Sequence, residues 1–131
     1  MNFFDFLSER SSIFLFQESN QHLTVFSSLD LEKNEICLPK SSGVAGWVFE
    51  NRKGAIVNRP QEDVRFYNAV DNLTGFHTRN IVCAPLMDQG DRCLGTLQSL
   101  NKKDGDFTID DLQLLDSTGR LLVAAVQRGM R

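Results

Sequence analysis

The chain has 131 residues with ordinary hydrophobic (41%) and charged (24%) content, which predicts one globular domain around a single core. Fourteen basic and seventeen acidic residues give a formal net charge of −3 without a basic stripe, which argues against direct binding to nucleic acid. No apolar run reaches the roughly 20 residues of a membrane span, and the N-terminus lacks the basic flank of a signal peptide, so we expect a cytoplasmic protein.

Six segments are typical of β-strands, because apolar and polar residues alternate in them and β-branched or aromatic residues are frequent. In chain order they are Ser11 to Phe16, Leu23 to Ser27, Glu35 to Leu38, Ala55 to Asn58, Asn80 to Leu86 and Cys93 to Leu100. Turn-forming residues occupy positions 18–21 and 88–91. They predict that the first two and the last two strands form antiparallel hairpins.

Helices are expected before and between these strands. A short helix covers Asn2 to Ser8, a second runs from Val44 to Asn51, and a helical turn lies around Asp63 to Val70. This turn falls within Gln61 to Thr78, a segment that is long for a plain connection. Long ordered loops in compact domains tend to be lids or binding loops, so we interpret this segment as a lid.

The clearest helix is the last one. Thr108 and Asp111 form a Thr-x-x-Asp variant of the capping box at its start. One apolar face should pack on the sheet: Leu112, Leu115, Gly119, Leu122, Val123 and Val126. A second, narrower patch consists of Leu114, Leu121 and Ala125, and either the N-terminal segment covers it or it is the seam of a dimer.

Antiparallel strands with helices on the faces of the sheet indicate an α+β fold. Three stretches that cover nearly the whole chain resemble the GAF family. Residues 43–48 (GVAGWV) are similar to the family's helix start, and residues 66–80 contain its D-x-x-T-G-F-x-T-R pattern. Leu94-Gly95, Asn101-Lys102 and Phe107 to Asp111 resemble its N-K…F-x-x-x-D signature.

The resemblance implies a GAF-like fold, a six-stranded antiparallel sheet with a ligand pocket and lid on one face and the N- and C-terminal helices on the other. It extends to the GAF domains of cyclic-nucleotide phosphodiesterases, adenylyl cyclases and bacterial signalling proteins. By this resemblance residues 1–131 are a single GAF domain of a larger multidomain signalling protein. Such a domain senses a small molecule, forms a homodimer and regulates a covalently linked output domain, while the fold alone does not name the ligand.

The start of the second helix is a candidate anion site. Gly43 and Gly46 let the backbone turn tightly into the helix, and the N–H groups of Val44 and Ala45 with the helix dipole suit a negative charge. In nucleotide-binding relatives the cyclic phosphate lies at this position. Gly46 can instead serve only close helix packing, and both interpretations stay open.

The lid carries three further candidates, Asp71, Thr74 and Thr78, whose oxygens suit a ribose, a phosphate or a base edge. Roles as turn or cap residues are the alternative for Thr74 and Asp71. The matching positions in family relatives contact the ligand. We therefore assign all three to the candidate pocket.

Four strand residues complete the predicted pocket by resemblance. Ser12 and Phe26 match positions that contact or stack on the purine in nucleotide-binding relatives. Ser27 and Gln98 stand where such relatives carry Asp and Glu, and they remove two carboxylates from the edge that recognises the base. A neutral Ser and Gln can hydrogen-bond an uncharged group, so the identity of a cyclic-nucleotide or similar ligand stays open.

Lys102 and Asp111 match a salt bridge that in the family ties the last strand to the last helix, remote from the ligand. Leu112 replaces the terminal Glu of that motif. We therefore assign the pair a structural role.

Catalytic chemistry is not expected. The cysteines (Cys37, Cys83 and Cys93) form no C-x-x-C pair, and the last two lie in apolar, strand-like surroundings. A GAF-fold enzyme, free methionine sulfoxide reductase, places Cys where this chain has Ala45. We expect no enzyme, no metal and no cofactor beyond a small-molecule ligand. The leading hypothesis is a ligand sensor, and the alternative is a dimerisation and signal-relay module with an empty pocket.

Overall fold

The computed structural model describes residues 8–28, 37–39, 42–66, 75 and 77–129, with residues 25–28 and 37–39 described as backbone only. Its centre is a six-stranded sheet in which every neighbouring pair is antiparallel, in the order β3-β2-β1-β6-β5-β4. The strands are β1 (Ser8–Gln17), β2 (His22–Ser28), β3 (Cys37–Pro39), β4 (Ala55–Val57), β5 (Ile81–Met87) and β6 (Cys93–Lys102). The six predicted strands and both predicted hairpins are confirmed, with ends that differ by a few residues.

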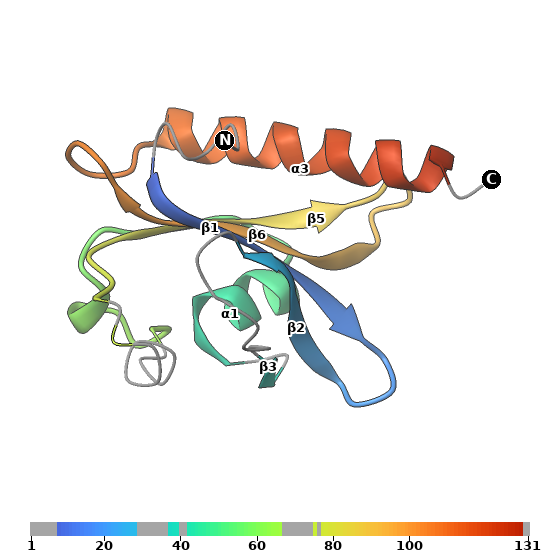
Figure 1. The fold of residues 1–131 in the computed structure, drawn as a ribbon, viewed down its shortest axis with the longest axis horizontal. Coiled ribbons are helices and arrows are strands. Elements are labelled where there is room, and N and C mark those ends of the chain that lie inside the picture. Colours follow the sequence, from blue (N-terminus) through green and yellow to red (C-terminus); the bar gives the residue numbers. More distant parts are fainter. Residues whose placement is uncertain (1–7, 29–36, 40–41, 67–74, 76, 130–131) are drawn as a thin grey trace.

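The two α-helices lie on opposite faces of this sheet (Figure 1). Helix α1 (Gly43–Asn51) ends at Arg52, whose backbone is left-handed (φ 56°) and whose N–H donates to the carbonyl of Val48. Helix α3 (Ile109–Gly129) runs along the other face, and a 3-10 turn, η2 (Pro60–Glu62), follows β4. The helix at 44–51 and the long last helix are therefore confirmed.

The strand alternation divides the core into two layers. The α1-side layer contains buried residues of four strands and of α1: Phe14, Leu23, Val44, Ala45, Val48, Ala55, Val57, Ile81 and Cys83. The α3-side layer consists of Val82, Ala84, Leu86, Leu97, Phe107, Leu115 and Val123. On β1, Phe14 therefore faces α1, whereas Ile13 and Leu15 pack on the α3 side.

Two segments that were predicted to be helical are only partly described by the structure. Ser8 begins strand β1 rather than ending a helix, and the rest of the segment from Asn2 lies outside the described part. The start of the turn predicted around Asp63 to Val70 is confirmed, because the N–H of Phe66 donates to the Asp63 carbonyl at 3.1 Å. The 3-10 turn η2 precedes it and was not predicted. Positions 67–70 lie outside the described residues.

The predicted packing face of α3 is wrong at two positions. Leu115, Gly119 and Val123 are buried, but Leu122 is 40% and Val126 60% exposed. The buried stripe has strict four-residue spacing, so Leu122 falls beside it, and the last turns of α3 run past the strand ends (Figure 1). The second patch is exposed in the described chain: Leu114, Leu121 and Ala125. What covers it stays open.

Candidate functional site

A polar row crosses the face of the sheet that α1 covers. Ser12 on β1 lies directly opposite Gln98 on β6, and Gln98 lies opposite Cys83 on β5. Residues directly opposite each other point to the same side of a sheet, and Cys83 belongs to the α1-side core. Ser12 is buried and Gln98 half-buried, and both lie on the α1 face; their contact with a ligand stays a prediction.

The first turn of α1 lies over this face. Gly43 has a left-handed backbone (φ 70°), and Val44 and Ala45 are buried. The first helical hydrogen bond runs from the N–H of Gly46 to Ser42, and Ser42 makes no side-chain cap. The N–H groups of Val44 and Ala45 therefore precede the intrahelical ladder, as an anion site requires.

The other predicted contacts are described only in part. Thr78 is buried, with 2% of its surface exposed. Phe26 and Ser27 lie on β2, where Ser27 pairs with Ile13, but their side chains are not described. Asp71 and Thr74 lie outside the described residues. The structure thus places Ser12, Gln98 and the first turn of α1 on one face and leaves the lid contacts of Asp71 and Thr74 as predictions.

Arg10 is a pocket-face residue that the sequence analysis missed. It lies two residues before Ser12 and opposite Leu100, which packs against the α1-side core. The register therefore directs Arg10 to the same face, and its Nε atom is buried. Arg10, Ser12 and Phe14 are spaced by two residues, which in a strand places them on the same face. This spacing is the sequence signal that could have identified Arg10.

A second missed group joins η2 to α1. The Arg65 guanidinium lies 4.6 Å from the centroid of the Trp47 ring and binds both carboxylate oxygens of Asp63 at 2.9 and 2.7 Å. The hydrogen bond from Arg65 lowers the pKa of Asp63. Cation–π contact and bidentate pairing together fix the start of the predicted lid segment on the helix.

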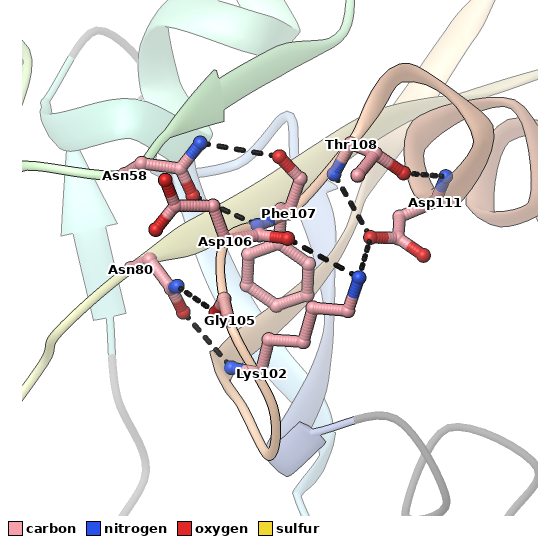
Figure 2. Close-up of polar contacts among 8 residues, drawn as sticks. All are labelled: Asn58, Asn80, Lys102, Gly105, Asp106, Phe107, Thr108 and Asp111. Carbon is pink, nitrogen blue, oxygen red and sulfur yellow. Dashed lines mark hydrogen bonds and ion pairs between the residues drawn. The ribbon is translucent and has the colours of Figure 1, made fainter.

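Lys102 and Asp111, assigned a structural role above, form an ion pair with Nζ 2.8 Å from Oδ2 (Figure 2). The Asp111 carboxylate also accepts from the N–H of Thr108, and the Thr108 hydroxyl accepts from the N–H of Asp111. Burial opposes ionisation of Asp111, but hydrogen bonds from Lys102 and Thr108 outweigh it and lower its pKa. The pair thus doubles as the cap of α3.

The two described thiols do not resemble nucleophiles. Burial raises the pKa of Cys83 to about 12, so this thiol is neutral at physiological pH. Burial also raises the pKa of Cys93, whose Sγ donates to the Gly95 carbonyl at 3.3 Å. Neither described cysteine has the lowered pKa that thiolate chemistry requires.

A twisted antiparallel sheet with one helix on each face defines an α+β domain. The model of the family described as GAF domain matches residues 5–126. The chain belongs to the GAF domain family.

Named relatives support this membership. A probable 3′,5′-cyclic phosphodiesterase (pde-5) of Caenorhabditis elegans is 33% identical over 119 residues, 79% of this chain but only 16% of that protein.

The GAF domain of a phosphoenolpyruvate-protein phosphotransferase from Coxiella burnetii has a similar fold, with a TM-score of 0.80 at 15% identity. The match covers 94% of this chain and 74% of that chain. A type II free methionine-R-sulfoxide reductase from Thermoplasma acidophilum has a TM-score of 0.75 at 11% identity, over 92% and 80% of the two chains. The fold is thus shared with a methionine-R-sulfoxide reductase as well as with the GAF domain of a phosphotransferase, and the chain spans less than a fifth of the phosphodiesterase. Within the described residues, neither helix is long and apolar enough to cross a membrane.

Proposed function

We propose that this chain is a regulatory GAF domain that binds a small anionic, nucleotide-like molecule between the sheet and α1, and that the bound molecule controls an attached output domain. The proposal rests above all on the polar row of buried Ser12 and half-buried Gln98 across a largely apolar face. Small-molecule sites are mostly apolar and use a few placed polar groups to orient the ligand. The α1 face of the sheet has this composition, because apolar core residues surround Ser12 and Gln98.

An anionic ligand is favoured by two positive elements near that row. The N–H groups of Val44 and Ala45 carry the positive end of the α1 dipole. Arg10 adds a guanidinium on the same face, and guanidinium groups recognise phosphate and carboxylate in a fork geometry. Similarity to a cyclic phosphodiesterase makes a nucleotide the first class to test.

We propose no catalytic role for the chain. The position where the enzyme of this fold carries Cys is Ala45, and Cys83 on the pocket face has a raised pKa. The alternative function is a homodimeric signal-relay module with an empty pocket. The exposed patch of Leu114, Leu121 and Ala125 on α3 favours that alternative.

Thermal unfolding of the purified chain distinguishes the two functions. Cyclic AMP, cyclic GMP and linear nucleotides are added at increasing concentration. A ligand at about 100 times its Kd that binds only the native state stabilises by about 2.7 kcal/mol, a shift of several degrees at this size. We expect one cyclic nucleotide to produce such a shift, whereas the relay module predicts none.

The assigned pocket is tested by the double variant Thr74→Val, Thr78→Val, which removes two hydroxyls at nearly constant volume. We expect it to abolish the ligand-induced shift. Thr118→Val on α3, whose hydroxyl donates to the Leu114 carbonyl far from the polar row, is the matched control and should respond as wild type. A double variant that also responds as wild type would show that the pocket is assigned wrongly.

A further inference from the structure

One buried side chain, Asn101, holds the C-terminal end of the lid. Its Nδ2 donates to the His77 carbonyl at 2.8 Å, and its Oδ1 accepts from the N–H groups of Arg79 and Asn80. These contacts bracket the peptide that carries buried Thr78. Only 1% of the Asn101 surface is exposed, so water does not replace these hydrogen bonds.

A second asparagine, Asn80, forms hydrogen bonds with the end of β6. The N–H of Asn101 donates to the Asn80 carbonyl at 2.9 Å, and the N–H of Lys102 donates to Asn80 Oδ1 at 2.9 Å. The Asn80 amide group also donates to the Gly105 carbonyl at 3.2 Å, in the turn that leads to α3 (Figure 2). Two buried asparagines thus join the start of β5, the end of β6 and this turn.

The next residue in the chain continues the connection to α3. The Nζ of Lys102 donates to the Asp106 carbonyl at 3.2 Å and pairs with Asp111, which caps the helix through Thr108 (Figure 2). Asn101 and Lys102 are neighbours, so one dipeptide contacts both the lid end and the first turn of α3. A network in which each side chain bonds the next, with a buried end at Asn101 and a half-buried end at Lys102, is coupled, so removing one member disturbs the others.

We infer that Asn101 is a positioning residue that fixes the backbone on both sides of buried Thr78 and couples this end of the predicted lid segment to the start of α3. The ligand contact of Thr78 rests on the proposed function, whereas the coupling itself does not. A ligand that restrains Thr78 stabilises the His77–Arg79 peptide on Asn101 and, through Lys102, the cap of α3. Coupling of this kind is reciprocal, so a substitution that destabilises the cap of α3 must also destabilise the backbone at residues 77–80.

The forward test uses Asn101→Gly in the full chain without ligand. Asn101 has a left-handed backbone (φ 59°), which glycine adopts without strain, so the variant removes the side-chain hydrogen bonds alone. Hydrogen exchange should become roughly tenfold faster in both segments 77–80 and 106–112, with β4 unchanged. Asp91→Gly has the same backbone angle (φ 59°) in the exposed β5–β6 turn and should change neither segment.

The reverse test uses Asp111→Asn, with Asp110→Asn in the same helical turn as the matched control. We expect Asp111→Asn to accelerate exchange of the Arg79 and Asn80 amides, which it does not touch, and Asp110→Asn to leave them unchanged. Acceleration confined to residues 106–112 would overturn the coupling. Uniform acceleration that includes β4 in both Asn101→Gly and Asp111→Asn would also overturn it, because the network would then be only a source of global stability.

Cyclic GMP serves as the probe in a third arm. In wild type it should protect 77–80 and 106–112 together, and in Asn101→Gly the protection of 106–112 should be lost. Failure of cyclic GMP to protect either segment in wild type would count against its being the ligand, while the two ligand-free arms would still decide the coupling.

Discussion

At the scale of single residues, the polar side chains of this domain act through partners that are distant in sequence. Asn58 bonds both the N–H and the carbonyl of Phe107, and Lys102 reaches Asp111 across a turn (Figure 2). The sequence motif predicted the Lys102–Asp111 pair, but Asn101 and Asn58 carry no local signal, because asparagine is common in turns. Their roles depend on which backbone groups the fold brings within reach.

The pH dependence of stability should reflect Asp111. Its folded pKa is lower than its unfolded value of about 3.9. Its stabilising effect is therefore fully present above the unfolded pKa and is lost as pH falls through the folded pKa. We expect Asp111→Asn to lower the free energy of unfolding by about 2 kcal/mol at pH 7. The difference from wild type, measured by urea unfolding, should shrink below about pH 4. A difference that stays constant down to pH 2 would contradict this origin.

Arg10 should select for charge in the ligand. Arg10→Gln removes the guanidinium from the pocket face while keeping a polar side chain, so affinity for cyclic GMP should fall about tenfold. Affinity for uncharged guanosine should change little. Titration calorimetry with both probes measures the contrast, and Arg120→Gln on exposed α3 is the control. Equal loss for both probes would mean that Arg10 supports the fold and not the ligand charge.

At the scale of elements, each strand and helix is placed by contacts that its own pattern only partly specifies. Strand-like composition predicted β5 and β6, but β5 is buried at every position from Ile81 to Met87, because helices cover both faces of the sheet there. The predicted face of α3 was too wide, since Leu122 falls outside the contact with the sheet. Helical periodicity gives the direction of an apolar face but not its width.

Gly95 on β6 leaves no room for a side chain beside β1. A Cβ atom at this position would lie 1.9 Å from the Phe14 carbonyl oxygen, so the two strands could not keep their spacing. We expect Gly95→Ala to lower the free energy of unfolding by about 3 kcal/mol. Gly90→Ala in the exposed turn, where a Cβ would have only an ordinary contact at 3.5 Å, should change it little. Equal effects in denaturant unfolding would contradict the steric origin.

The exposed patch of α3 leads to a prediction about assembly. Leu121 is 70% exposed, and together with Leu114 and Ala125 it forms the surface that the sequence suggests as a dimer seam. If that surface joins two copies, Leu121→Glu should convert a dimer to a monomer in sedimentation velocity, because a charge in an apolar interface is costly. Gln113→Glu, also exposed on α3, is the charge-matched control. An unchanged sedimentation profile would remove this patch from any interface.

At the scale of the whole molecule, the sheet separates the two surfaces for which we propose functions. The α1 side carries Ser12, Gln98 and the first turn of α1, and the α3 side carries a long helix with an exposed apolar patch. The network around Asn101 and Lys102 lies where the end of the lid meets the start of α3. A sensor needs such a link, because a ligand can shift an equilibrium only through contacts that differ between two states.

The sequence by itself determined the family, the six strands and the two long helices, because alternation, helical periodicity and the glycine-rich turn are local properties of the chain. It also predicted the Lys102–Asp111 pair, which the structure contains, and Ser12 and Gln98 as site residues, which stay predictions. Only the tertiary structure decided that Arg10 lies on the α1 face, that Arg65 stacks on Trp47 and that Asn101 bonds the backbone of His77 and Arg79. Those contacts join residues far apart in sequence or depend on strand register, and neither distance nor register is encoded in any one segment of the chain.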